Sequence, residues 1–312
     1  MKNLSVTVVI PTYRPDEKFK KLLSRLEKQT RPPERILIIN TEEQYFSWQA
    51  VDGIRGASVL HIGKKEFDHG GTRDLGVRMA DTDLVVFMTM DAIPADTHLL
   101  ENLTAPFEEE RVCAAYARQL PDKDCSPLEA YTRRFNYGQE SRIKTKADLP
   151  ELGIKTFFCS NVCAAYRRST YLELGGFERP TIFNEDMIFA GKLIQADRAV
   201  AYCAGARVIH SHNYTGVQQF RRNTAKIGRN FDLGVSQADH PEIFSMAKSE
   251  TEGLKMVKQT ARWLISTKKA WLLPSLVWQS GCKFLGYRLG KNYKKLSRRF
   301  IGFCTMNPEY WT

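Results

Sequence analysis

The segment that decides the fold is SVTVVIPTYRPDEKFKKLLSRLEKQTRPPERILIIN, residues 5–40. Its first six residues are mostly β-branched and apolar and stop at Pro11, which predicts a buried strand. A helix is predicted next, because apolar residues recur there at helical spacing: Phe19, Leu22, Leu23 and Leu26. Pro32 and Pro33 break this helix, and a second buried strand follows at Ile36–Ile39. A strand, a helix and a strand with short breaks form a βαβ unit, so the segment predicts a parallel sheet.

The alternation of strands and helices continues to residue 91. We predict a third strand at residues 57–62 (ASVLHI), a helix at 71–80 (GTRDLGVRMA) and a fourth strand at 82–91 (TDLVVFMTMD). Because these strands are continuously apolar, helices are expected on both faces of the sheet. The sequence therefore predicts an α/β fold with a Rossmann-like, mostly parallel central sheet and flanking helices.

The second half of the chain has a more mixed pattern. Strands are predicted at residues 111–120, at 154–168 as one long strand or a strand pair, and at 198–210 as one or two strands. Helices are predicted at residues 126–138, at 169–177 with Gly175 and Gly176 as the stop, and at 184–197.

The composition is that of a globular protein with a sizeable core, since 43% of the 312 residues are hydrophobic. The N-terminal residues lead from one lysine directly into a strand, so we expect no signal peptide. No window reaches the roughly 18 apolar residues that a membrane-spanning helix needs. The seven cysteines are scattered, and the closest pair, Cys159 and Cys163, does not have zinc-site spacing. Free thiols in a reducing compartment, such as the cytoplasm, are expected.

The net charge of +11 is concentrated in the last fifth of the chain. Residues 251–312 contain twelve Lys or Arg and two acids, a net charge of +10, which leaves +1 for residues 1–250. We therefore expect a nearly neutral domain at 1–250 and a basic, amphipathic segment at 251–312. The basic residues indicate a polyanionic partner, either nucleic acid or an anionic membrane surface. Aromatic residues interleaved with them suit a lipid interface, whereas a helical pair packed on the domain is the alternative: Trp263, Trp271, Trp278, Phe284, Tyr287 and Phe300.

Polar residues follow three of the predicted strands, at residues 11–15, 40–43 and 89–92. Ligands of open α/β sheets bind outside the carboxyl ends of the strands, so these residues mark a candidate cleft. Asp91 is an isolated acid at the end of a buried strand, and it either binds a ligand in this cleft or caps the turn before Pro94.

Three further segments carry residues suited to chemistry. HGGTRDLG (69–76) places glycines and Arg73 at the start of a helix, where backbone N–H groups and a guanidinium meet a phosphate, although it is neither a Walker sequence nor GxGxxG. FNEDMIF (183–189) opens a helix with adjacent acids that act as helix caps or as a base. VIHSHNYT (208–215) ends a strand with two histidines, which are either ligands or structural hydrogen-bond partners.

Taken together and in this order, the five motifs resemble the inverting glycosyltransferases of family 2, which have a GT-A fold. The resemblance covers about residues 5–235 and extends to VIHSHNYTGVQQFRR (208–222) as the late histidine and basic helix. The likeness is strongest to rhamnosyltransferases, through His69–Arg73, Thr89–Ala92 and His210–Tyr214. It implies transfer of L-rhamnose from dTDP-β-L-rhamnose, with inversion, onto a hydroxyl of a lipid-linked cell-wall or surface polysaccharide.

The resemblance also implies roles for individual residues. Asp186 is the expected general base, with Glu185 as the fallback, and Asp91 with His210 or His212 is expected to bind Mn²⁺ or Mg²⁺. The remaining donor contacts implied are Pro11, Thr12, Tyr13, Asn40, Gly71, Arg73, Met90, Arg221 and Arg222. A lipid-linked acceptor places the protein in the cytoplasm, peripherally on the inner face of the plasma membrane.

Two departures from the family pattern bear on the donor and on the metal. Asn40 stands where many members have a base-binding aspartate, and only Asp91 remains of the DxD turn. A family 2 enzyme that uses another donor, such as a UDP-hexose, is therefore the alternative. A nucleic-acid-binding protein is a more distant alternative, because no helix-turn-helix, zinc or RNP pattern accompanies the basic segment. We expect no nucleic-acid partner.

Overall fold

A computed structural model describes residues 4–210, 216–246 and 250–311, with side chains in all of these except 216–226, 250–251 and 309. The chain forms two compact units. The first contains residues 1–123, 136–179 and 185–211, and the second contains residues 124–135, 180–184 and 212–312.

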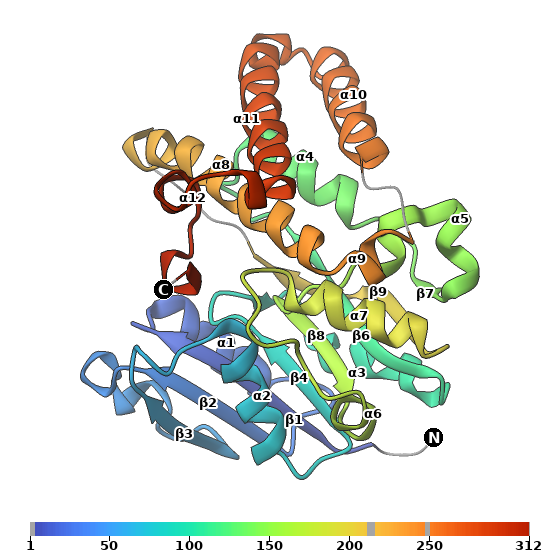
Figure 1. The fold of residues 1–312 in the computed structure, drawn as a ribbon. Helices are drawn as coiled ribbons and strands as arrows, with labels where there is room; N and C mark the ends of the chain where they lie inside the picture. The colour runs from blue at the N-terminus through green and yellow to red at the C-terminus, as the bar shows by residue number, and fades with distance from the viewer. Residues whose placement is uncertain (1–3, 211–215, 247–249, 312) are drawn as a thin grey trace. The chain divides into compact units, whose positions relative to one another are not determined.

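The first unit is built on one sheet, whose strands follow the order β3-β2-β1-β4-β8-β6-β9-β5, with β7 paired to β9 (Figure 1). The strands are β1 (Val6–Tyr13), β2 (Arg35–Thr41), β3 (Ala57–Ile62), β4 (Leu84–Met88), β5 (Ile93–Pro94), β6 (Val112–Leu120), β7 (Arg142–Lys144), β8 (Cys163–Arg167) and β9 (Ala199–Ile209). The helices of this unit are α1 (Glu17–Glu27), α2 (His69–Met79), α3 (Leu99–Thr104), α5 (Leu149–Leu152), α6 (Arg168–Glu173) and α7 (Glu185–Gln195).

The N-terminal half of this sheet is parallel, as the opening segment predicts. β1 pairs in parallel with β2 on one side and with β4 on the other, and β2 pairs in parallel with β3. Asp16 caps α1 through the backbone N–H groups of Lys18 and Phe19. The helix buries its apolar residues against the core: Phe19, Leu22, Leu23 and Leu26. These parallel pairings bring the carboxyl ends of β1, β2 and β4 to one edge of the sheet.

The other half of the sheet is mixed. β8 runs antiparallel to both β4 and β6, whereas β6 and β9 are parallel and their register shifts between Ala117 and Arg118. The short strands β5 and β7 both pair antiparallel with β9. The fold class predicted from the sequence is therefore confirmed. Of the antiparallel strands, β7 and β8 belong to the second half of the chain, whose sequence pattern is less regular, whereas the short β5 precedes it.

One predicted strand is wrong. Residues 154–161 were expected to begin a long strand, but Gly153–Phe157 forms a 3₁₀ helix and the strand β8 starts only at Cys163. Thr156 and Phe157 of this 3₁₀ helix are buried, although the helix is not part of the sheet. Burial therefore does not distinguish this segment from a strand. Its carbonyl groups are bonded instead by the buried ammonium of Lys144, which donates to Lys155 O at 3.0 Å and to Phe158 O at 2.5 Å.

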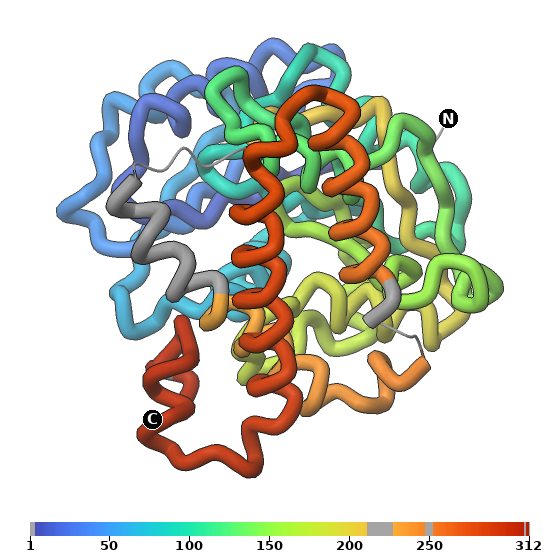
Figure 2. Tube along the Cα trace, turned by 90° about the horizontal axis from the view of Figure 1, so that it is seen from above, coloured from blue at the N-terminus to red at the C-terminus, as the bar shows by residue number. Residues whose placement is uncertain are grey.

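The second unit is helical. It contains most of α4 (Pro127–Asn136), followed by α8 (Gly216–Asp239), α9 (Pro241–Phe244), α10 (Glu250–Ser266), α11 (Leu273–Lys291) and α12 (Arg298–Cys304). α10 and α11 run side by side as a hairpin (Figures 1 and 2). α11 packs closely on α8 through Gly286 and Gly290, which have no side chain. A Cβ at Gly286 would overlap the Ile227 carbonyl oxygen, and one at Gly290 would overlap the Phe231 carbonyl oxygen. The predicted boundary between residues 250 and 251 therefore lies inside this unit.

The C-terminal residues fold back on α8 through a buried acid. Asp232 accepts hydrogen bonds from Thr305 Oγ1 at 2.7 Å, from the Met306 N–H at 3.0 Å and from Asn307 Nδ2 at 3.0 Å. The small core beside it contains Ile182, Phe231, Val235, Ile301 and Cys304.

Two expectations about the chain as a whole are met within the described residues. All seven cysteines are free, as predicted. None of the described helices combines the length and the hydropathy needed to cross a bilayer.

Candidate active site

The carboxyl ends of β1, β2 and β3 are joined by a buried amide. Thr12 Oγ1 donates to Asn40 Oδ1 at 3.1 Å, and Asn40 Nδ2 donates to Glu42 O at 3.2 Å and lies 3.0 Å from His61 Nδ1. Asn40 is fully buried. Its amide is therefore engaged with the protein itself and fixes these three strand ends relative to one another.

Exposed aromatic rings lie beside this network. Tyr13 at the end of β1 contacts Tyr45 edge-to-face, with ring centroids 5.7 Å apart, and the Arg14 guanidinium lies 4.2 Å from the Tyr45 ring centroid. Both tyrosines are 39% exposed. A planar base could stack on such a surface. Pro11 lies two residues before Tyr13 in β1, opposite Ile39 of β2.

Asp91 and His210 meet because β5 pairs antiparallel with the end of β9. Ile93 lies opposite Ile209 in this pairing, so the residues that precede β5 approach the residues that follow β9. Asp91 Oδ2 lies 3.4 Å from His210 Nε2, and the side chains are 22% and 8% exposed. The adjacent Met90 is half-buried and packs against the main core.

Gln119 in β6 orients the His210 ring. The Gln119 amide nitrogen donates to Tyr137 Oη at 2.5 Å and to Ser160 Oγ at 3.0 Å. Its oxygen is therefore the acceptor that lies 3.2 Å from His210 Nδ1, so Nδ1 carries a proton. The other ring nitrogen, Nε2, is thereby directed at Asp91.

The Asp91–His210 pair fits a divalent cation. Adjacent ligands of an octahedral ion at about 2.1 Å lie about 3 Å apart, and the two atoms here are separated by 3.4 Å. The outer hydrogen bond from His210 to Gln119 is of the kind that ligating histidines make. Within the described part of the chain, no group of three or more His, Cys, Asp or Glu residues could hold a metal. A cation here would take its other ligands from phosphate and water.

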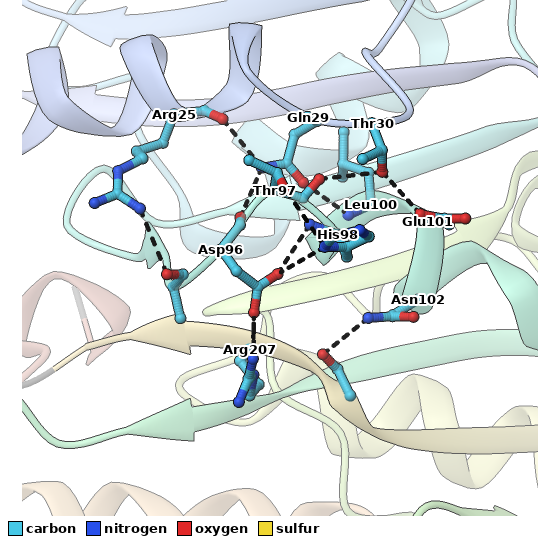
Figure 3. Close-up of polar contacts among 12 residues, drawn as sticks. Arg25, Gln29, Thr30, Asp96, Thr97, His98, Leu100, Glu101, Asn102 and Arg207 are labelled. Carbon is cyan, nitrogen blue, oxygen red and sulfur yellow. Dashed lines mark hydrogen bonds and ion pairs between the residues drawn. The ribbon is translucent and has the colours of Figure 1, made fainter.

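The segment after the Asp91 turn is anchored on two sides (Figure 3). Asp96 forms an ion pair with Arg207 of β9 at 2.7 Å, and its backbone oxygen accepts from Gln29 Nε2 at 3.0 Å. Gln29 Oε1 in turn accepts the Leu100 N–H at the start of α3, at 3.2 Å. These bonds join the segment that follows the Asp91 turn to Gln29, to α3 and to β9.

A second group of polar residues gathers at the start of α7. Asp186 accepts the backbone N–H of Asn161 at 3.0 Å and that of Met187 at 2.8 Å. Glu185 Oε1 accepts from Asn161 Nδ2 at 3.2 Å and lies 3.4 Å from a terminal nitrogen of Arg73. Asn161 therefore bonds both carboxylates, one through its backbone and the other through its side chain.

The environment of Asp186 suits proton transfer. Burial raises the pKa of Asp186 to about 7, and the negative charge of Glu185 adds to the rise, while the bonds from Asn161 and Met187 and the charge of Arg73 oppose it. A carboxylate that changes protonation near neutral pH is able to accept a proton as a general base at that pH.

Arg73 is buried and faces Glu185 and not open solvent. One terminal nitrogen donates to His69 O at 2.8 Å and lies within reach of Glu185, whereas its Nε has no hydrogen-bond partner among the described residues. Gly71, two residues earlier in α2, is buried, and a Cβ there would lie 2.5 Å from the Arg179 guanidinium. The expectation that Gly71 and Arg73 contact the donor stays a prediction, and the observed contact of Arg73 is with Glu185.

Comparison with known proteins now places the chain. Residues 7–175 match the model of a family described as "Glycosyl transferase family 2". The chain belongs to glycosyl transferase family 2. It is 39% identical over 310 residues to the O-antigen chain rhamnosyltransferase RfbN of Salmonella typhimurium, a match that covers 99% of this chain and 96% of that protein. It is 38% identical over 310 residues to the O-antigen chain rhamnosyltransferase WbaN of Salmonella anatum, covering 98% and 96%. The resemblance to family 2 predicted from the motifs is confirmed.

Solved structures support the fold of this family 2 chain. The mannosyltransferase PcManGT from Pyrobaculum calidifontis, in complex with GDP-Man and Mn²⁺, superposes with a TM-score of 0.63 at 14% identity, over 94% of this chain and 88% of that one. S. aureus TarS 1–349 gives a TM-score of 0.53 at 13% identity, over 94% and 92%. At these identities the likeness concerns the fold alone.

The family 2 site also contains residues that the sequence motifs did not single out. Asn161 bonds two carboxylates and Gln119 bonds His210, yet neither residue lies in a motif with an acid or a histidine. Asn161 lies in the segment mistaken for strand, where a polar residue inside an apolar run was the available signal.

Three predicted site residues lie outside this description. His212 is not among the described residues, and Arg221 and Arg222 lie in α8, where side chains are not described. Their predicted roles at the metal and the diphosphate stay predictions.

Proposed function

We propose that this family 2 glycosyltransferase moves L-rhamnose from dTDP-β-L-rhamnose, with inversion, onto a hydroxyl of a growing, lipid-linked surface polysaccharide such as an O-antigen chain. The observation that carries the proposal is the identity of 39% with an O-antigen chain rhamnosyltransferase over nearly the full length of both proteins. The Asp91–His210 pair and the Glu185–Asp186 pair supply the groups that such a reaction needs.

The donor is held at the carboxyl ends of β1, β2 and β4. The exposed ring of Tyr13 stacks with the base, and Thr12 and Asn40 keep the strand ends beneath it in place. Asp91 and His210 would hold Mn²⁺ or Mg²⁺, since the spacing of their side-chain atoms is close to that of adjacent ligands of such an ion. When bound, this ion neutralises charge on the departing diphosphate.

Asp186 acts as the general base. The acceptor hydroxyl attacks the anomeric carbon from the face opposite the diphosphate and forms the new C–O bond. The bond between that carbon and the diphosphate oxygen breaks at the same time, and the hydroxyl proton passes to Asp186. Glu185 raises the pKa of Asp186, and Asn161 holds both carboxylates in place.

A lipid-linked acceptor calls for a place on the membrane, and α11 offers one. Exposed residues on α11 recur at steps of three and four: Pro274, Val277, Trp278, Gly281, Phe284, Leu285 and Arg288. Leu276, Gly286 and Gly290 are buried on the other side of the helix. With Trp271 at the hairpin turn, 74% exposed, the members of this set other than Arg288 form an apolar surface that we call the α11 stripe. The protein would lie in the cytoplasm, peripherally on the inner face of the plasma membrane.

Charge indicates that the α11 stripe faces anionic lipid and not a second copy of the chain. Residues 253–308 contain twelve Lys or Arg and no Asp or Glu. Two such surfaces would repel each other, whereas anionic headgroups attract them and indole rings favour the headgroup region.

The α11 stripe is tested with vesicles. The parent protein is expected to sediment with phosphatidylglycerol vesicles and much less with phosphatidylcholine ones. Trp271→Ser combined with Trp278→Ser should weaken binding at least about tenfold, while Trp48→Ser, also at an exposed tryptophan, should not. Equal binding by all three proteins would refute the proposal that the α11 stripe binds the membrane. A loss of dimers in light scattering, without a change in lipid binding, would assign the stripe to self-association.

The reaction is tested with purified protein, Mn²⁺ and a lipid-linked saccharide acceptor. Release of dTDP from dTDP-β-L-rhamnose, together with a product heavier by one deoxyhexose in mass spectrometry, is expected. Turnover with a UDP-hexose and none with dTDP-rhamnose would instead support the alternative donor and refute the proposed one.

A further inference from the structure

The groups assigned to the metal and to the base are both supported by one short turn, residues 160–162, between the 3₁₀ helix and β8. Ser160 Oγ accepts from Gln119, whose oxygen faces His210. Asn161 bonds Asp186 and Glu185. The backbone oxygen of Val162 accepts the Thr89 N–H at 3.1 Å, at the start of the turn that carries Asp91.

We propose that this turn sets the metal-binding pair and the base relative to each other, acting through two positioning residues: Asn161 in the turn itself, and Gln119 of β6, which is bonded to Ser160. The inference rests on the function proposed above. No residue of the turn is itself required to touch the substrate.

Asn161 is well held and therefore able to act in this way. It is 3% exposed, and its side-chain oxygen accepts from Tyr166 Oη at 2.8 Å. Tyr166 is fully buried, and its hydroxyl lies 3.4 Å from Cys159 Sγ. The Asn161 amide orientation is thereby fixed with its nitrogen toward Glu185. Hydrogen bonds from such fixed neighbours hold a reactive carboxylate within a few tenths of an ångström of the position that catalysis requires.

The two positioning residues should give different signatures. The charged and titratable groups around Asp186 are Glu185, Arg73, Cys159 and Tyr166. Asn161→Asp keeps the size of the side chain but brings another negative charge to this group. It should therefore move the ascending limb of the kcat/KM pH profile upward by about one pH unit, with little change in Mn²⁺ affinity.

Gln119→Met removes the acceptor that orients His210 and leaves the carboxylates alone. Outer-sphere partners of ligating histidines typically contribute about 10–100-fold to metal affinity, so Mn²⁺ binding measured by calorimetry should fall by at least about tenfold. The pH limb should stay in place. Asn102→Asp makes the same chemical change as Asn161→Asp at an exposed residue of α3 and is the matched control. It should alter neither the pH profile nor the Mn²⁺ affinity.

A readout without turnover separates this inference from the proposed function. Infrared titration of the Asp186 carboxyl, identified by its loss in Asp186→Asn, reports its pKa in the absence of any donor. An upward shift in Asn161→Asp supports the inference even if rhamnose transfer is not detected. If Asn161→Asp does not fold, Asn161→Ser, which loses the bond to Glu185, must change kcat by at least about tenfold more than KM. Unchanged titration with folded Asn161→Asp, or unchanged Mn²⁺ affinity in Gln119→Met, overturns the proposal.

Discussion

The pH dependence of transfer provides a direct test of the carboxylate pair. Asp186 can act as a base only when it is deprotonated, and its pKa is raised to about 7 by burial and then by Glu185. The active fraction of the enzyme therefore changes near neutral pH. From pH 6 to pH 8 that fraction rises from about one eleventh to about ten elevenths, so kcat/KM should increase about tenfold. Glu185→Gln keeps the shape of the side chain and removes its charge, so the pKa of Asp186 should fall by about one unit.

The assay follows kcat/KM, because this parameter reports the pKa values of the free enzyme, the state described by the structure. At pH 6, Glu185→Gln should retain about half of its own plateau value, whereas the parent retains about a tenth. Glu173→Gln, an exposed glutamate of α6, is the control and should follow the parent. A Glu185→Gln profile that coincides with the parent, or that moves to higher pH, would refute the coupling between the two carboxylates.

Three other predictions concern separate parts of the molecule. Asp186→Asn should retain donor binding but lose about 10²–10⁴-fold in kcat, since the amide cannot accept a proton; turnover within a few-fold of the parent would contradict the assignment. Asp91→Asn should leave the melting temperature unchanged but weaken Mn²⁺-dependent dTDP binding by at least about tenfold in calorimetry. Gly286→Ala should lower the free energy of unfolding in urea by about 1–2 kcal/mol, because its Cβ meets the Ile227 carbonyl. Gly281→Ala, whose Cβ meets nothing within 4 Å, should be neutral or stabilising.

The sequence predicts most of the parallel half of the sheet because its signals are local. The segment from Val6 to Thr41 forms its strands and helix from consecutive residues, and Pro33 lies in the predicted break between α1 and β2. The predicted stop at Pro11 is wrong, because β1 continues through Pro11 to Tyr13 and pairs there with β2. Asp91, Asp186 and His210 are likewise visible in sequence, because each follows or opens an element with a clear apolar pattern. The structure places Asp91 beside His210 and Asp186 beside Glu185.

The rest depends on contacts between distant residues. The 3₁₀ helix at Gly153–Phe157 is stabilised by Lys144 of β7, and the sequence of residues 153–157 gives no indication of that contact. Gln119 is distinguished only by the register shift between β6 and β9, which brings it beside His210. Arg73 was expected to face phosphate, but it lies against Glu185, a residue more than one hundred positions away. Such pairings are set by the tertiary structure.

The packing of α8 on α11 has a consequence for how the basic segment is studied. Gly286 and Gly290 allow the α11 backbone to approach the carbonyl groups of Ile227 and Phe231 in α8. Removing residues 251–312 would also remove the partners of Phe231 and Val235, which are buried in a core that α12 completes. A truncated chain that failed to bind lipid would therefore not distinguish a lost membrane surface from an unfolded helical unit. Substitutions at Trp271 and Trp278 avoid this ambiguity, because both side chains point away from that core and are largely exposed.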